Sequence, residues 1–93
     1  MRRTLLRSPA FARDLRRWLK LHSDAATSIA AALDQMSADA AHPSLRSHKL
    51  RGRLAGCWAC SAGYDLRIVF EFVQHEGRET IHLLALGTHD EVY

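Results

Sequence analysis

The sequence has no long hydrophobic run, no apolar leader and no repeats. No stretch of 18 or more consecutive apolar residues occurs, so we expect no transmembrane helix and no membrane partner. The basic start, MRRTLLRSPAFARDLRRW, lacks the apolar core of a secretory signal, which predicts a cytoplasmic protein. Without internal repeats or low-complexity segments, the 93 residues are expected to form one domain, 1–93.

Cysteine is also scarce, since Cys57 and Cys60 are the only two. Two cysteines exclude the disulfide framework of a small secreted domain. They form a C-x-x-C pair, but structural zinc needs four ligands and the chain has no second such pair. A redox pair needs a helix N-terminus to lower the thiol pKa, whereas this pair falls in a predicted strand. We therefore expect both to pack, with no metal and no cofactor. Trp58, between them, fits either a core or a nucleic-acid platform.

Acidic residues are few near the basic segments. Within the first twenty residues a single acid, Asp14, faces seven basic residues: Arg2, Arg3, Arg7, Arg13, Arg16, Arg17 and Lys20. A second cluster has no acid among its members: Arg46, Lys49, Arg51 and Arg53. The formal net charge is +3, and most of the acid lies after residue 64. Basic residues near the N-terminus and acidic residues towards the C-terminus favour a polyanion partner. For the first basic cluster, the alternative is a solvated helix face.

Two helices are predicted in the first half of the chain. Ser8 is a good N-cap and Pro9 suits the first helical turn. Apolar residues then recur at helical spacing, which predicts a helical hairpin over residues 9–22 and 24–38. Ser23 and Asp24 are the predicted cap of the second helix.

Strands are predicted around this hairpin. Before it, RRTLLRS can form a short strand; after Pro43, the apolar spacing changes from helical to alternating. The four later strands are HKLRGRLA, GCWACSA, DLRIVFEFV and ETIHLLALG, with turns at Gly63–Tyr64 and at HEG. This order predicts an α+β fold: a short N-terminal strand, a helical hairpin, then an antiparallel β-sheet. The helices should cover one sheet face, and the other should carry Arg51, Arg53 and Arg67.

Four segments of the sequence resemble one known family. They are SPAFARDLRRW, SHKLRGRLAGCW, YDLRIVFEF and LLALGTHDEVY. Together, and in this order, they resemble the RelE/ParE toxin superfamily and most of all its YafQ-like branch. That family's pattern is a D/S-H-x-L-x-G motif, then a strand of the D-x-R-I-V-Y kind, then G-T/S-H and a C-terminal aromatic residue. The resemblance covers nearly the whole chain and implies a RelE/ParE-like fold.

The resemblance also implies a function and partners. It implies a toxin of a type II toxin–antitoxin system, whose partners are a cognate antitoxin, the 70S ribosome and mRNA. The implied activity is ribosome-dependent, metal-independent endoribonuclease cleavage of translated mRNA in the A site. By position, the implied catalytic residues are His48, Asp65, Arg67 and His89, and Tyr93 stands at the terminal aromatic.

The sequence departs from the YafQ-like branch at two positions. Ser61 stands where the branch often has a histidine, and Ala85 stands where it often has an arginine. Arg67 and Arg51 could supply the missing positive charge.

The implied chemistry agrees with the residue types. Cleavage by a ribose 2′-OH needs one group to remove its proton, a second to protonate the leaving 5′ oxygen, and a cation for the charge on phosphorus. Histidine suits the first two roles because its ordinary pKa is about 6.5. Arginine matches phosphate oxygens, and an aspartate beside a histidine can fix its tautomer. We expect His48 and His89 to be the acid–base pair, in either order. The expected RNA-binding residues are Lys49, Arg51, Arg53 and Tyr93.

Two other functions remain open from the sequence. A ParE-like inhibitor of DNA gyrase would share the fold but would need neither His48 nor His89. A non-catalytic RNA- or ribosome-binding module would use the same basic cluster. The two histidines favour the nuclease over the gyrase inhibitor, whereas only an activity measurement separates the nuclease from the binding module. The other histidines are predicted to be structural: His22, His42, His75 and His82.

Overall fold

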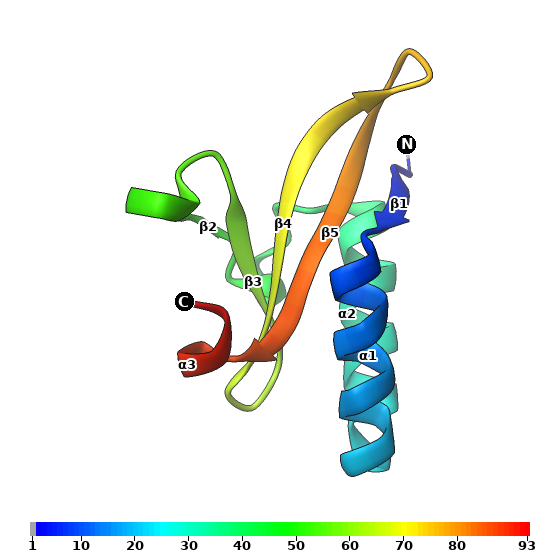
Figure 1. The fold of residues 1–93 in the computed structure, drawn as a ribbon. Helices are drawn as coiled ribbons and strands as arrows, with labels where there is room; N and C mark the ends of the chain where they lie inside the picture. Colours follow the sequence, from blue (N-terminus) through cyan, green and yellow to red (C-terminus); the bar gives the residue numbers. More distant parts are fainter. Residues whose placement is uncertain (1) are drawn as a thin grey trace.

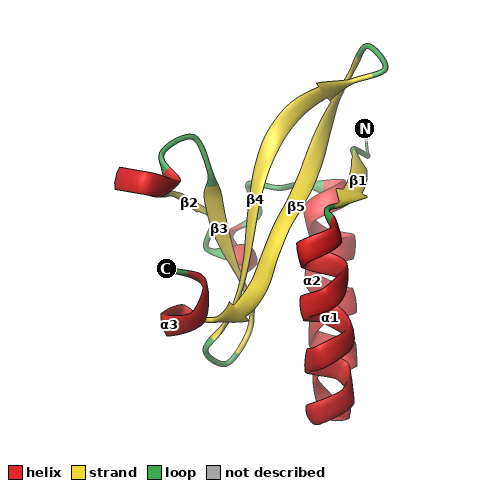
Figure 2. Ribbon diagram, viewed as in Figure 1, coloured by secondary structure: helices red, strands yellow, loops and turns green. Residues whose placement is uncertain are grey.

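A five-stranded mixed sheet carries a helical hairpin on one face (Figures 1 and 2). The structure is a computed structural model and describes residues 2–93. The strand order is β1-β5-β4-β3-β2, in which β1 (Thr4–Arg7) runs parallel to β5 (Arg78–Thr88) and all other neighbours are antiparallel. The predicted α+β fold is confirmed, and the N-terminal strand adds a parallel pairing at one edge.

The hairpin consists of α1 (Pro9–Leu21) and α2 (Ala26–Ala38). Ser8 caps α1 as predicted, because its Oγ accepts a hydrogen bond from the backbone N–H of Phe11 at 3.0 Å. The predicted cap of α2 is wrong. Ser23 and Asp24 lie instead in a 3₁₀ turn, η1 (Ser23–Ala25), that leads directly into α2, and the helix has no side-chain cap.

The core lies between the hairpin and the sheet. Phe11 and Met36 are fully buried from the helix side, and Ile68, Phe70 and Leu83 are fully buried from the sheet side. Each such side chain contributes about 1.5–3 kcal/mol on burial. Since side chains alternate along a strand, these residues leave their strand neighbours on the face away from the helices. No helix within residues 2–93 is both long and apolar enough to cross a membrane.

The first strand after the helices is much shorter than predicted. Only His48–Lys49 form β2, and the chain then leaves the sheet. Gly52 has φ +67°, a left-handed conformation that breaks the alternation and begins a 3₁₀ turn, η3 (Gly52–Leu54). The prediction that Arg51 and Arg53 share a sheet face is therefore wrong. Both are exposed on a loop that stands out beside β2 (Figure 1).

Three longer strands, β3 (Trp58–Gly63), β4 (Leu66–His75) and β5, complete the sheet. The predicted HEG turn is confirmed, with positive φ at Glu76 and Gly77 joining His75 to Arg78. The other turn lies one residue later than predicted, at Tyr64–Asp65, because Gly63 still pairs with β4.

The chain ends in a helical turn that the sequence prediction lacked. After β5 ends at Thr88, α3 (His89–Val92) packs on β5 and β4. In Figure 1, α3 lies across the sheet from α1 and α2.

Candidate active site

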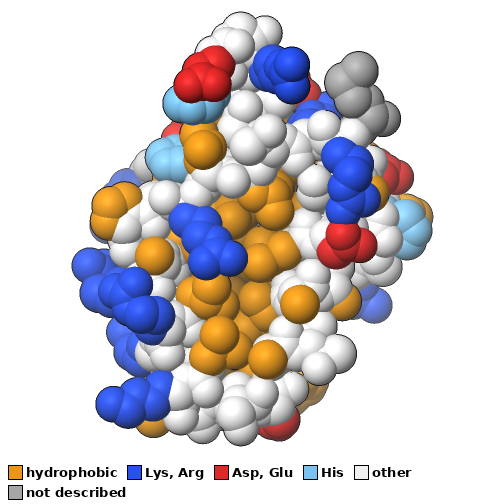
Figure 3. Space-filling view, turned by 90° about the vertical axis from the view of Figure 1, so that its right-hand side faces the viewer, with side chains coloured by type: hydrophobic (Ala, Val, Ile, Leu, Met, Phe, Trp, Pro, Cys, Tyr) orange, Lys and Arg blue, Asp and Glu red, His pale blue; other side chains and the backbone are white. Residues whose placement is uncertain are grey.

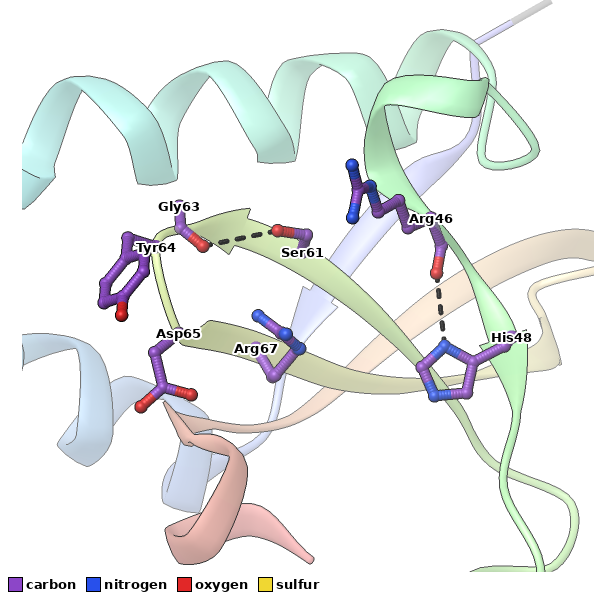
Figure 4. A pocket seen from close by; sticks show the side chains of 7 residues that line it. All are labelled: Arg46, His48, Ser61, Gly63, Tyr64, Asp65 and Arg67. Atoms are coloured by element: carbon purple, nitrogen blue, oxygen red, sulfur yellow. Dashed lines mark hydrogen bonds between the residues drawn. The ribbon is translucent and has the colours of Figure 1, made fainter.

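A cavity of about 520 Å³ opens at the β3–β4 turn and extends towards β2 (Figure 4). It is lined by Arg46, His48, Ser61, Gly63, Tyr64, Asp65 and Arg67. The structure therefore brings three of the four predicted catalytic residues to one cavity. Ser61 and Arg67 are direct neighbours across β3 and β4, so the first departure from the family pattern also lies in this cavity.

The ring of His48 is held on both nitrogens. Nδ1 lies 3.1 Å from the backbone carbonyl oxygen of Arg46, and Nε2 lies 3.4 Å from the hydroxyl of Tyr93. A carbonyl can only accept, which assigns the proton of the neutral ring to Nδ1. Nε2 is then an acceptor that faces the Tyr93 hydroxyl. This tautomer leaves Nε2 free to take a proton once that hydroxyl moves away.

His89 is the first residue of α3, and this helix sets its position. Thr88 and Glu91 form a reciprocal capping box: the Glu91 N–H donates to Thr88 Oγ1 at 3.3 Å, and the Thr88 N–H donates to Glu91 Oε1 at 2.9 Å. One turn of helix then brings Tyr93 beside His89, with the ring centroids 4.5 Å apart and the rings edge to face. His89 does not line the cavity itself. Tyr93 stands between it and His48.

Gly87 allows α3 to pack this closely. A Cβ at Gly87 would lie 3.0 Å from Glu91 Oε1 and 3.2 Å from Val92 Cγ1. Gly87 is also the β5 neighbour of Arg67 on β4. The glycine before Thr88 therefore lets α3 pack against the end of β5, beside the strand position of Arg67.

The environment of Tyr93 keeps its hydroxyl protonated. Burial raises the pKa of Tyr93, and the nearby positive charge of Arg67 opposes that rise. A protonated phenol can donate its hydrogen to His48 Nε2.

Asp65 lines the cavity without touching a histidine. It has φ +51° at the β3–β4 turn, and within residues 2–93 it makes no hydrogen bond or ion pair with His48 or His89. In Figure 4 its carboxylate is directed away from His48, towards α3. The Arg46 carbonyl, rather than a carboxylate, orients His48.

Arg46 is the lining residue that sequence analysis missed. The sequence places Arg46 only in the second basic cluster, but its guanidinium extends over the cavity (Figure 4). Its backbone is left-handed, at φ 52° and ψ 41°, which turns its carbonyl towards His48. A positive φ at arginine cannot be read from sequence, although the preceding H-P-S-L turn is a signal that the chain reverses there.

The predicted RNA-binding side chains lie outside this cavity. Lys49 Nζ lies 5.5 Å from the ring centroid of Trp58, a cation–π contact. Arg51 and Arg53 are exposed on the loop around η3. Ala85, the second departure from the family pattern, pairs with Val69 and does not line the cavity.

The two cysteines and Trp58 lie away from the candidate chemistry. Cys60 is buried against Met36, with Sγ and Sδ 3.7 Å apart, and burial raises the pKa of its thiol to about 12. Burial also raises the pKa of Cys57. Trp58 packs edge to face on Phe72 beside the core, which favours a core role over a nucleic-acid platform.

The remaining histidines make local contacts. His82 Nδ1 lies 2.9 Å from Glu71 Oε2, and the Ser44 N–H donates to His42 Nδ1 at 3.1 Å. His22 contacts the ring of Trp18, and His75 lies at the β4–β5 tip beside Glu76. None of them lines the cavity. In the part of the chain that the structure describes, no group of three or more histidine, cysteine and acidic side chains is arranged to hold a metal ion.

Comparisons with known proteins agree with this architecture. Residues 3–93 match the family described as bacterial toxin of type II toxin–antitoxin system, YafQ. No curated protein matches the chain by sequence at a significant level.

Solved toxins share the fold over nearly the whole chain. YafQ from E. coli superposes with a TM-score of 0.80 at 14% identity, covering 98% of each chain. The toxin in the E. coli DinJ–YafQ toxin–antitoxin complex gives 0.79 at 15% identity, covering 100% of this chain and 99% of that one. A metal-bound toxin from Helicobacter pylori gives 0.77 at 26% identity and covers 100% of both.

Proposed function

Because the chain belongs to the YafQ family of toxins from bacterial type II toxin–antitoxin systems, we propose that it is a ribosome-dependent endoribonuclease that cleaves translated mRNA. The observation that carries the proposal is the position of the Tyr93 hydroxyl, 3.4 Å from His48 Nε2, with His89 packed against the same ring. The Tyr93 hydroxyl lies at the position where His48, acting as a general base, would bind a substrate hydroxyl. In the RNA complex, the ribose 2′-OH takes that place.

His48 is the proposed base and His89 the proposed acid. His48 Nε2 accepts the 2′-OH proton while Arg46 holds the other ring nitrogen. The 2′ oxygen attacks phosphorus as the bond from phosphorus to the 5′ oxygen breaks, and His89 gives that oxygen a proton. The products are a 2′,3′-cyclic phosphate and a 5′-OH end. Each positioned group contributes about 10²–10⁴-fold to the rate.

Arg67 is the proposed cation for the reacting phosphate. It lies on β4 between the two histidine-bearing elements and lines the cavity. Its guanidinium makes one internal hydrogen bond, from Nη1 to the Leu66 carbonyl at 3.2 Å. The other N–H groups can meet non-bridging phosphate oxygens.

The shape of the site supports dependence on the ribosome. The His89 side chain is 59% exposed, and His48 and Asp65 are also exposed. Such an open site does not hold RNA in reactive geometry by itself, so the ribosome must position the substrate. The loop carrying Arg51 and Arg53 supplies exposed positive charge for RNA.

A cognate antitoxin is the proposed protein partner, as in the structurally similar DinJ–YafQ complex. The helical face supports this partner, because an apolar strip runs down it with Lys and Arg side chains along one edge (Figure 3). Exposed basic residues of α1 include Arg13, Arg16 and Lys20. A segment with apolar and acidic side chains would complement that surface.

Cleavage of a defined ribosomal complex tests the proposed function. Purified protein is added to 70S ribosomes holding an mRNA with one A-site codon, and to the same complex with 2′-O-methyl groups in that codon. We expect A-site cleavage of the first mRNA only, with 2′,3′-cyclic phosphate ends, and a loss of at least about 100-fold in the His48→Gln variant. Cleavage of the methylated codon would contradict 2′-OH attack, and binding without cleavage would favour a non-catalytic module.

A further inference from the structure

Two arginines face the same cavity without a carboxylate partner. Arg46 approaches it from the segment before β2, and Arg67 from β4 (Figure 4). Among residues 2–93, neither takes part in an ion pair, whereas Arg2, Arg3 and Arg17 each pair with an acid. Unpaired arginines that converge on one cavity mark it as a place for an anion.

The backbone holds Arg46 in this position. Its left-handed conformation is disfavoured for arginine, typically by about 1–2 kcal/mol. Contacts on either side maintain it: the Arg46 N–H donates to the Pro43 carbonyl at 3.2 Å, and Ser47 Oγ donates to the Ala40 carbonyl at 2.9 Å. The same conformation turns the carbonyl towards His48 and the side chain towards the cavity. One residue therefore orients the proposed base and presents a charge beside it.

Within residues 2–93, Arg46 and Arg67 are the only Lys or Arg side chains that line this cavity. The β-sheet neighbours of Arg67 on either side are Ser61 and Gly87, which are uncharged. The lining residues carry two positive charges, from Arg46 and Arg67, and one negative charge, from Asp65. In Figure 4, the Asp65 carboxylate is directed away from both guanidinium groups.

We propose that Arg46 and Arg67 form one anion subsite, which binds the phosphodiester that His48 and His89 act on. The ligand class is an RNA phosphodiester, and this inference rests on the proposed function. A phosphodiester carries one negative charge, and the five-coordinate phosphorus species formed by 2′-OH attack carries two. Two guanidinium groups match the second species better than the first, which is the condition for accelerating the reaction.

The substitutions that test the subsite separate charge from backbone shape. Arg46→Asn removes the guanidinium but keeps a residue that tolerates the left-handed conformation. Arg46→Lys keeps the charge without the two-pronged donor set. Arg67→Gln removes the second cation. Arg78→Gln is the matched control, because Arg78 lies at the β4–β5 tip outside the cavity.

Binding is measured by NMR titration with a trideoxynucleotide, which lacks the 2′-OH and cannot be cleaved. We expect Arg46→Asn and Arg67→Gln each to weaken binding by about 10-fold or more, Arg46→Lys to lie between, and Arg78→Gln to change it less than about 2-fold. Shifts at His48 and Arg67 amides locate the ligand. Wild-type affinity in a folded Arg46→Asn variant, or shifts outside the cavity, would overturn the subsite. Binding in the cavity by a wild type that never cuts mRNA would keep the subsite and overturn the proposed nuclease.

Discussion

The Tyr93 hydroxyl meets His48 Nε2 at 3.4 Å, although 45 residues separate them in the chain. This contact joins the C-terminal turn to the edge strand β2. His89 packs edge to face on the same ring, so Tyr93 contacts both histidines. Tyr93 therefore has two separable roles. Its hydroxyl contacts Nε2 of His48, the proposed base, and its ring packs against His89.

Substitutions at Tyr93 should separate these roles. Tyr93→Phe keeps the ring against His89, and the substrate 2′-OH replaces the lost hydroxyl, so we expect cleavage within about threefold of wild type. Tyr93→Ala removes the ring and should reduce cleavage by about tenfold or more, because His89 loses its support. Single-turnover cleavage on programmed ribosomes measures both. Equal losses in the two variants would contradict the division of roles.

The docking of α3 should be strongest between about pH 5 and pH 9. The hydrogen bond from the Thr88 backbone N–H lowers the pKa of Glu91. The ionised Glu91 carboxylate therefore stabilises the docking of α3 at every pH above the ordinary glutamate pKa, and this stabilisation is lost as pH falls through the lowered pKa. Burial raises the pKa of Tyr93. The protonated phenol therefore stabilises the docking of α3 at every pH below the ordinary tyrosine pKa of about 10, and this stabilisation is lost as pH rises through the raised pKa.

Amide hydrogen exchange across residues 89–93, followed against pH, measures this docking. Thr88→Ala should weaken the capping box by about 1 kcal/mol and raise exchange in α3 at every pH. Protection that is flat from pH 3 to pH 11, or unchanged by Thr88→Ala, would show that these groups do not hold α3.

The loop around η3 should contribute to ribosome binding. Arg51→Ala and Arg53→Ala should each weaken binding and reduce the salt slope by about 0.7–0.9 for every phosphate contact that is lost. Arg78→Ala is the control, because Arg78 lies at the β4–β5 tip, away from α3 and η3 (Figure 1). Affinity that is unchanged across salt in both loop variants would exclude this loop from the RNA interface.

The thiol of Cys60 should be unreactive in the folded protein, and that of Cys57 less protected. At pH 8, a thiol with a pKa of about 12, as at Cys60, has a thiolate fraction on the order of 10⁻⁴. We expect a Cys57→Ser variant to react with a disulfide reagent only as fast as it unfolds, and a Cys60→Ser variant to react faster through Cys57. Rapid labelling of native Cys60 would contradict its packing role.

The helices could be predicted because their signals are local. Ser8 and Pro9 mark the start of α1, and the apolar residues of both helices recur at helical spacing. The β2 prediction failed for a local reason too. HKLRGRLA alternates like a strand, but Gly52 adopts a left-handed conformation that the alternation does not reveal. On an edge strand, only one neighbour opposes such a departure.

The site was only partly predictable. His48 and His89 were named through the family resemblance, and no local pattern places them together. Tyr93 contacts both rings, and it does so because α3 forms. The capping box of α3, Thr88 with Glu91 three residues later, is visible in the sequence. Arg46 could not be singled out, since its direction depends on a left-handed backbone that tertiary contacts maintain.

The most direct test of the central claim is the mapping of mRNA 5′ ends in a bacterial host. The wild type, His89→Ala and the control His75→Ala are each induced while a reporter mRNA is translated; His75 lies at the distant β4–β5 tip. Our account predicts in-frame cuts with the wild type and with His75→Ala, and their loss with His89→Ala. Growth arrest without cuts would contradict the nuclease and favour gyrase inhibition, and cuts that persist in His89→Ala would remove that histidine from the chemistry.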